Sequence, residues 1–243
     1  LAIAEDLHDK KRMGMAMLNL GVAYRNLGDD QKAEEFYRRK LEISQELGDK
    51  RGLGIVIGNI GALHLSRGEY GQAIDCYSRR IEIAEEIGDR RGVGTALGNL
   101  AAIFKDLGQY DRALEASNQA VQIMRTLGVK YYLCTFLDTQ AGLFLRLGRI
   151  AEARDRNREA LVIAEEIKNG EIVFKSRVNQ AKIAAHDDRS AAIKALEALA
   201  GTYPDDENQA ILYYELFKLT GDPRHKDRSV ELYRKLLPIQ FEI

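Results

Sequence analysis

The sequence predicts an all-α protein, built as a solenoid of stacked antiparallel helix hairpins. Three observations support this fold class: a forty-residue internal repeat, apolar residues at helical spacing within each copy, and a glycine where the first helix of each copy should end. An amphipathic helix cannot bury its apolar face alone, so neighbouring copies must cover one another. We expect about 12 to 13 helices in the 243 residues.

The repeat continues without gaps from residue 1 to residue 160. Segment 41–54 reads LEISQELGDKRGLG and recurs as IEIAEEIGDRRGVG at 81–94 and, more weakly, as LAIAEDLHDKKRMG at 1–14. Segment 18–40, LNLGVAYRNLGDDQKAEEFYRRK, has further copies at 58–80, 98–120 and, more loosely, 138–160. A constant offset over four copies indicates an array of equivalent units.

Each unit divides into two helices. In the first copy a helix is expected over 15–27 and a second over 30–47, where the apolar residues follow a 3.6-residue period. A glycine in a left-handed conformation is suited to end each first helix, at Gly28, Gly68, Gly108 and Gly148. Asp49 and Asp89 stand where they can cap the N-terminus of the next first helix.

The glycine-rich stretch GLGIVIGNIG at 52–61 lies inside one of these first helices. It has neither the G-x-G-x-x-G spacing nor the G-K-[ST] ending of a phosphate-binding loop. Each glycine costs about 1 kcal/mol relative to alanine in a helix interior, so close helix packing must offset this cost. We expect Gly61 to admit its partner helix, and Gly52, Gly54 and Gly58 to admit the preceding repeat.

The order L-G-x-x-Y, then G-D/E-Y, then alanine ahead of an aromatic residue resembles the tetratricopeptide repeat (TPR). In the first copy the matching residues are Leu20, Gly21, Tyr24, Gly28, Ala33 and Tyr37. In the second they are Ile60, Gly61, Gly68, Tyr70, Ala73 and Tyr77. The forty-residue form is similar to that of kinesin light chains, Pins-type polarity adaptors and many bacterial signalling proteins. This resemblance implies a right-handed superhelix with a concave groove.

The predicted organisation is a single solenoid over 1–243. We expect 1–8 to end a truncated repeat, 9–168 to form four repeats, 169–204 a degenerate repeat and 205–243 a terminal capping hairpin. Later helices are expected near 171–185, 189–200, 207–220 and 225–237. Because the chain begins on Leu1 in the middle of the pattern, we expect it to be part of a longer protein.

Composition argues against several functions. A formal net charge of −1 provides no field to attract nucleic acid or an anionic membrane, and no apolar run approaches a membrane span. Two isolated cysteines, Cys76 and Cys134, indicate a reducing, cytoplasmic setting. The four histidines stand apart, and the adjacent carboxylates Glu85 and Glu86 belong on a solvated helix face. We therefore expect no catalysis, no metal and no cofactor.

A recurring polar position on the first helices provides a candidate site. The same place in successive repeats is held by Asn19, Asn59, Asn99 and Asn179, with Thr139 in the fourth repeat. The resemblance implies that this position lines the groove, where a carboxamide can pair with both N–H and C=O of an extended peptide. The alternative is that each asparagine bonds to the neighbouring repeat and only sets the stacking.

The family register implies further groove residues. In the first two repeats they are largely apolar: Met15, Leu18, Val22, Arg25, Ile55 and Leu65. In later repeats they are basic: Lys105, Arg146, Lys175 and Lys182. Such a groove suits a segment that is apolar at one end and acidic at the other.

Two features of the register limit the choice of partner and the extent of the site. Val22, Ala62, Leu18 and Gly58 replace the asparagines and lysines of the family's carboxylate clamp, which argues against Hsp70 or Hsp90 tails. The second-helix cations Arg38, Arg39, Lys40, Arg79 and Arg80 are expected to face outward.

Three functional hypotheses follow. The first is a non-catalytic scaffold that binds a peptide or protein segment in the groove. The second is a regulatory or sensory tail of a larger bacterial signalling enzyme (a kinase, nucleotide cyclase or ATPase), which acts on its own catalytic domain. The third is self-association through an exposed helix face at Leu1, Ile3 and Leu7, and another at Phe241.

Overall fold

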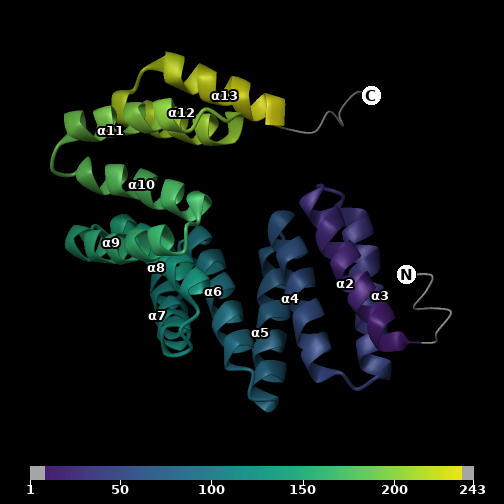
Figure 1. Cartoon of the computed structure of the whole chain (residues 1–243). Helices are drawn as coiled ribbons and strands as arrows, with labels where there is room; N and C mark the ends of the chain where they lie inside the picture. Colours follow the sequence, from purple (N-terminus) through teal and green to yellow (C-terminus); the bar gives the residue numbers. More distant parts are fainter. Residues whose placement is uncertain (1–8, 237–243) are drawn as a thin grey trace. The chain divides into compact units, whose positions relative to one another are not determined.

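A computed structural model of the chain describes residues 9–236, and this part is all helical (Figure 1). Twelve helices and no strand occur within it, which confirms the predicted fold class and helix number. The residues proposed for self-association, Leu1, Ile3, Leu7 and Phe241, lie outside the described residues.

The helices alternate between first and second members of hairpins. The first members are α2 (Lys10–Asn26), α4 (Lys50–Ser66), α6 (Arg90–Asp106), α8 (Lys130–Arg146), α10 (Gly170–Ala184) and α12 (Asp206–Thr220). The second members are α3 (Asp30–Glu46), α5 (Tyr70–Glu86), α7 (Tyr110–Thr126), α9 (Ile150–Glu166), α11 (Arg189–Thr202) and α13 (Pro223–Leu236). These bounds agree with the expected helices to within a few residues.

Local signals set where the helices begin and end. The Asp49 and Asp89 side chains accept hydrogen bonds from the backbone N–H groups of Gly52 and Gly92, at 2.8 and 3.0 Å, and so cap α4 and α6 as predicted. The glycines that follow first helices adopt positive φ, at Gly28, Gly68, Gly108 and Gly148 (79°, 73°, 72° and 71°). This left-handed conformation is the helix ending that the repeat pattern predicts.

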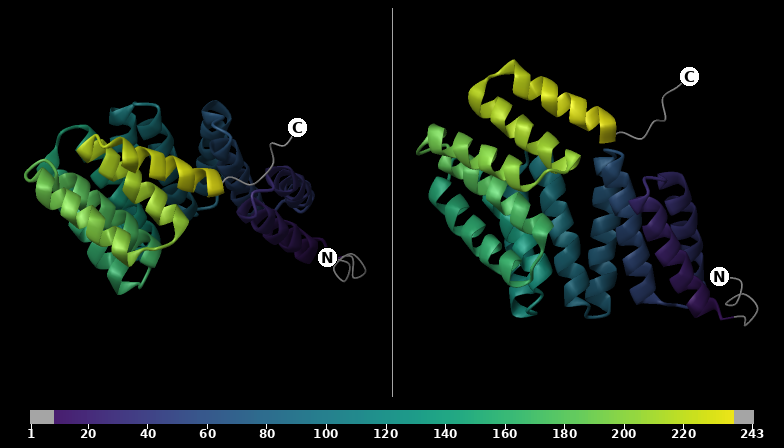
Figure 2. Two further views of the ribbon diagram at one scale, coloured as in Figure 1. Left: turned by 90° about the horizontal axis from the view of Figure 1, so that it is seen from above. Right: turned by 45° about the horizontal axis from the view of Figure 1, so that its top comes forward.

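The chain divides into two compact units, Leu1–Phe136 and Leu137–Ile243. In the first unit each helix packs on the next, and α4 also contacts α2 and α6 (Figure 2). Because α4 touches both α2 and α6, these three first helices form a continuous layer. In the second unit α9 to α13 also pack in chain order. The single solenoid over 1–243, with its truncated, degenerate and terminal repeats, stays a prediction.

The glycines of 52–61 are buried in the body of α4, and their contacts explain them. A Cβ at Gly61 would lie 3.0 Å from the Cys76 Cβ of α5, so this glycine admits the partner helix as predicted. Gly52 packs first against the Asp49 carboxylate that caps its own helix and then against Lys40 of the preceding repeat, so the prediction is confirmed only in part. For Gly54 and Gly58 the prediction was wrong. They face Ile83 and Arg80 of their own second helix, because α5 crosses α4 at that level.

Candidate functional site

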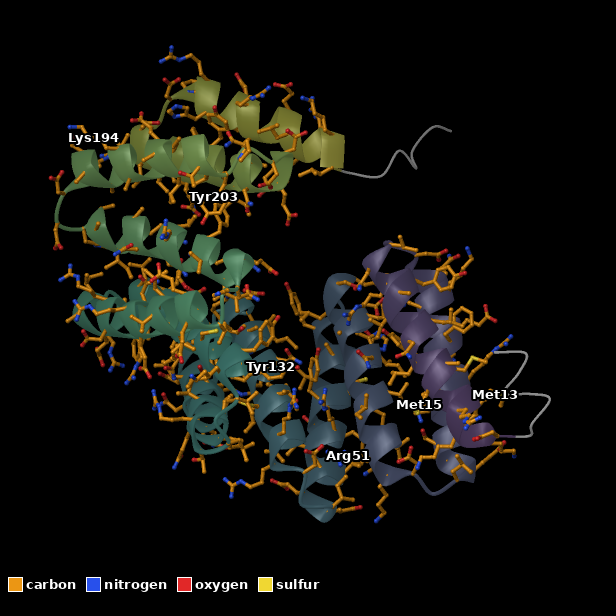
Figure 3. All side chains as sticks on the ribbon, viewed as in Figure 1. Met13, Met15, Arg51, Tyr132, Lys194 and Tyr203 are labelled. Carbon is orange, nitrogen blue, oxygen red and sulfur yellow. The ribbon has the colours of Figure 1, made fainter. Side chains whose placement is uncertain are left out.

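The candidate surface of the first unit lies on α2, α4 and α6. Met15 is 58% exposed on α2 (Figure 3). Five other predicted groove residues of this unit are half-buried, namely Leu18, Val22, Arg25, Ile55 and Leu65. Partly covered apolar side chains on one layer of helices provide a surface that a second chain could cover without unfolding the core.

Within residues 9–236, no hydrogen bond ties Asn19, Asn59 or Asn99 to a neighbouring repeat. Asn19 is exposed, Asn59 and Asn99 are half-buried, and each stands on a different first helix. The Asn59 Nδ2 donates to the Ile55 carbonyl oxygen of its own helix at 3.2 Å. Within residues 9–236, no hydrogen bond joins Asn19 or Asn99 to another side chain or backbone group. Their carboxamides therefore do not hold the repeats together.

The equivalent position of the second unit has a different role. The Asn179 Nδ2 donates to the Asp138 Oδ1 of α8 at 3.1 Å, and the Ser176 hydroxyl donates to the same oxygen at 3.0 Å. Burial raises the pKa of Asp138, and these two hydrogen bonds partly oppose that rise. Asn179 thus bonds to the preceding first helix, as the stacking alternative describes.

The basic groove residues mostly have carboxylates beside them. The Lys175 Nζ lies 2.6 Å from the Glu171 Oε1, and the Lys182 Nζ lies 3.6 Å from the Glu215 Oε1. Burial lowers the pKa of Lys182, although Glu215 opposes this effect. In the first unit, Lys105 lies 3.5 Å from Asp106. Arg146, at the end of α8, is exposed. The positive charge expected of the later repeats is therefore largely balanced.

Two second-helix cations do not face outward, contrary to expectation. Lys40 is only 5% exposed, and its Nζ lies 3.4 Å from the Asp49 Oδ2. Arg80 is half-buried against Gly58. The sequence pattern suggested a solvated face because charges alternate there, but glycines on the adjoining first helices leave room for these two long side chains. Arg38, Arg39 and Arg79 do face solvent, paired with Glu34, Glu35 and Glu82.

An aromatic cluster that the sequence reasoning missed borders this surface. Tyr132, near the start of α8, has its ring centroid 5.9 Å from that of Phe136, and the Arg91 guanidinium lies 5.5 Å from the Tyr132 ring centroid (Figure 3). Phe136 packs on Gly98, where a Cβ would come within 2.8 Å of the Phe136 Cδ1. The signal that could have found the cluster is this glycine, because a buried helix position without a side chain leaves room for a large neighbouring residue.

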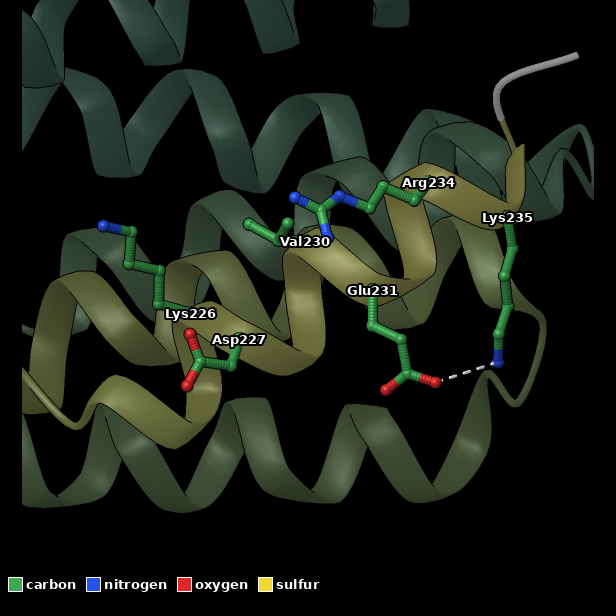
Figure 4. Close-up of a pocket in the computed structure, with 6 residues that line it drawn as sticks. All are labelled: Lys226, Asp227, Val230, Glu231, Arg234 and Lys235. Atoms are coloured by element: carbon green, nitrogen blue, oxygen red, sulfur yellow. Dashed lines mark ion pairs between the residues drawn. The ribbon is translucent and has the colours of Figure 1, made fainter. Parts of the chain in front are cut away.

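The other sites considered lack convergent chemistry. A depression on α13 is lined by charged residues and Val230 of that one helix, with Glu231 and Lys235 ion-paired at 3.2 Å (Figure 4). In the described part of the chain, no three His, Cys, Asp or Glu side chains gather as a metal site would require. Nor is any helix among residues 9–236 both long and apolar enough to cross a membrane.

The family assignment agrees with this architecture. The model of the tetratricopeptide repeat matches residues 12–86, 53–126 and 92–166, which together cover more than half of the chain. The chain belongs to the tetratricopeptide repeat family. The TPR resemblance of the sequence is thereby confirmed, and the matched residues are those in which the forty-residue period is most regular. A search of curated proteins gave no match.

Several solved structures share the TPR fold of this chain. The apo form of RapI superposes with a TM-score of 0.78 at 17% identity, over 97% of this chain and 88% of that one. A Rap protein complexed with competence and sporulation factor superposes with a TM-score of 0.74 at 13% identity, over 94% of this chain and 64% of that one. A third structure is a signal transduction ATPase with numerous domains from Pyrococcus horikoshii, which has a tetratricopeptide repeat sensor. It superposes with a TM-score of 0.68 at 18% identity, over 96% of this chain and 37% of that one. At these identities the likeness shows the fold alone.

Proposed function

We propose that this TPR chain is a non-catalytic binding module, and that an extended peptide or protein segment lies along α2, α4 and α6 of the first unit. The observation that carries the proposal is the difference between equivalent asparagines. Asn19 and Asn99 make no hydrogen bond within the described residues, and Asn59 makes one within its own helix, whereas Asn179 bonds to a neighbouring first helix.

The chemistry of the carboxamide supports a chain as the ligand. Each asparagine offers two N–H donors and one carbonyl acceptor, which match the alternating C=O and N–H groups of an extended backbone. Such contacts grip a chain without reading its side chains. The half-buried Val22, Ile55 and Leu65 beside them add apolar contact, so side-chain preference would come from these positions.

We further propose that the partner is a peptide or protein other than an Hsp70 or Hsp90 tail, and that binding takes place in the cytoplasm. A Rap protein of similar fold has been solved in complex with competence and sporulation factor, which supports a peptide or protein partner for this chain. The substitutions at 18, 22, 58 and 62 argue against the Hsp70 and Hsp90 tails that the carboxylate clamp binds. Neither Cys76 nor Cys134 forms a disulfide bond within residues 9–236, which accords with a reducing cytoplasm.

The test is selection of binders from a displayed library of random dodecapeptides, with the full chain as bait. Fluorescence anisotropy then measures the affinity of selected peptides for the wild type and for the double variant Asn59→Ala/Asn99→Ala. We expect about tenfold weaker binding with unchanged helix content, because each amide contributes roughly 0.5–1.5 kcal/mol. Gln45→Ala/Gln122→Ala, which removes two exposed amides from second helices, is the matched control and should bind as the wild type does. Unchanged affinity in the asparagine variant would refute the proposal.

A second candidate function is the sensory or regulatory part of a larger signalling enzyme. It is supported by the TPR sensor of the Pyrococcus ATPase, 37% of whose chain aligns with 96% of this one. The full-length gene product decides between the two, because this reading requires a catalytic domain on the same polypeptide.

A further inference from the structure

The Arg80 side chain of the second helix α5 packs against the first helix α4. Its side chain leaves α5 and lies across Gly58 of α4, where a Cβ would come within 2.8 Å of the Arg80 Cδ and 3.0 Å of its Cζ. Gly58 and Asn59 are consecutive residues of α4. Arg80, Arg51 and Ile55 also line one small pocket between α4, α5 and α6.

Neither arginine of this pocket has an acidic partner. Within residues 9–236, no carboxylate lies within 4 Å of the Arg80 or Arg51 guanidinium, and Arg80 donates no hydrogen bond. Burial lowers the pKa of Arg80, which reflects the cost of holding this charge away from water. Holding a half-buried guanidinium without a protein carboxylate costs free energy, and an anionic group of a ligand would offset that cost.

The residue equivalent to Arg80 in the first repeat is a cation that does have a carboxylate partner. Lys40 corresponds to Arg80, and Asp49 corresponds to Asp89. Leu18 stands where α4 has Gly58, and Lys40 lies beside Asp49 instead. In the second repeat, the glycine opens a path that Arg80 takes across α4.

We propose that Arg80, with Arg51 at the rim, binds a carboxylate group of the segment held on the first unit. This inference rests on the proposed function and adds a specificity-determining contact to it. The pocket is lined by Lys50, Arg51 and Arg80 against Asp89, and Lys50 is paired with Glu86 at 2.9 Å. The pocket and its paired Glu86 therefore carry a net charge of about +1, which a single carboxylate would balance. The guanidinium fork matches both carboxylate oxygens.

The experiment compares peptides selected by the full-length wild type. Libraries with free and with blocked C-termini are screened, and selected sequences are synthesised with Glu or Asp changed to the amide and with the C-terminus free or amidated. A side chain is the source if the Glu→Gln change weakens binding, and the peptide terminus is the source if amidation does. Either result, with about a tenfold loss, supports the proposal.

The protein variants separate recognition from structure. Arg80→Gln should lower affinity for the acidic peptide about tenfold, leave affinity for its amide counterpart within about twofold, and keep or raise the Tm. Arg80→Lys, which keeps the charge but not the fork, should fall between the wild type and Arg80→Gln. Arg79→Gln, an exposed neighbour paired with Glu82, should change neither affinity.

Three results would overturn the inference: selected peptides without a carboxylate preference, equal losses for acidic and amide peptides in Arg80→Gln, or a lowered Tm that marks a structural role. The first leaves the proposed function intact. A wild-type chain that selects no peptide refutes both proposals.

Discussion

The two units of this TPR chain treat the polar groups of their first helices in opposite ways. In the first unit, Asn19 and Asn99 are without hydrogen-bond partners and Arg51 and Arg80 without carboxylates, among the residues described. In the second unit, Asn179 and Ser176 both bond to Asp138, and Lys182 lies beside Glu215.

The difference separates binding from stacking within one repeat pattern. A buried polar group is costly unless it is hydrogen-bonded, and in the second unit Asn157, Ser176 and Asn179 find their partners within the unit. The first unit exposes equivalent groups on a layer of touching helices, where a partner chain could satisfy them. Position in the repeat therefore does not decide the role of a residue; the available partners decide it.

The largest effect is expected at Lys40, a buried cation of the first unit that does have a carboxylate partner. Asp49→Ala removes the cap of α4 and leaves Lys40 buried without its carboxylate, which should lower the free energy of unfolding by about 3 kcal/mol. Asp89→Ala removes only a cap, because no ion pair joins Asp89 to Arg80 among the described residues, and should cost about 1 kcal/mol. Urea denaturation measures both, and equal losses would contradict the contrast between Lys40 and Arg80.

A pair of glycines tests packing in the two units. Gly98→Ala places a methyl group against the Phe136 ring and should cost about 1–2 kcal/mol. Gly142 lies inside α8 with no heavy atom within 4 Å of an added Cβ, so Gly142→Ala should stabilise by up to about 1 kcal/mol. Thermal unfolding should move the two Tm values in opposite directions; a shift in the same direction would refute the packing account.

Two asparagines test the distinction between stacking and binding directly. Asn157 is 3% exposed, and its Nδ2 donates to the Ser176 carbonyl at 2.8 Å, so Asn157→Ala should cost about 2 kcal/mol. Asn99→Ala removes no hydrogen bond within the described part and should stay within about 0.5 kcal/mol of wild type. Comparable losses in denaturation would show that Asn99 has a structural role after all.

The smallest effect concerns Asp138 and depends on pH. Burial raises the folded-state pKa of Asp138 above its ordinary 3.8, so the stability that its neutral form confers is lost as pH rises through that raised value. Asp138→Asn keeps an acceptor for Ser176 and Asn179 without the charge. Its Tm should exceed that of wild type at pH 7.5, and the gain should vanish near pH 3.8. A variant less stable at both pH values would show that the ionised carboxylate itself is required.

The fold was predictable from the sequence because its signals are local and periodic. Helix spacing, Gly28 and its equivalents, and the caps at Asp49 and Asp89 depend only on residues within one repeat. The regular forty-residue period also predicted the tetratricopeptide repeat family correctly. Because the same signals recur in each copy, the prediction of every hairpin is supported by the equivalent residues of the others.

The site was only partly predictable because it depends on side-chain direction between repeats. Lys40 and Arg80 share a charged helix face with Arg39 and Arg79, and only the glycines opposite decide which of them turn inward. Asn179 shares its register with Asn99, but Asp138 takes up its amide because the fourth repeat has a carboxylate where the third has Gly98. Periodicity alone could not distinguish these cases.

The most direct test of the account follows the asparagine side chains themselves. The ¹⁵N–¹H resonances of the side-chain amides are recorded with and without a peptide selected by the full chain. We expect the Asn19, Asn59 and Asn99 amides to shift on binding, and those of Asn157 and Asn179 to remain in place. Unmoved Asn59 and Asn99 amides, in a chain that nevertheless binds the peptide, would contradict the claim that the first unit binds through groups its own fold leaves unpaired.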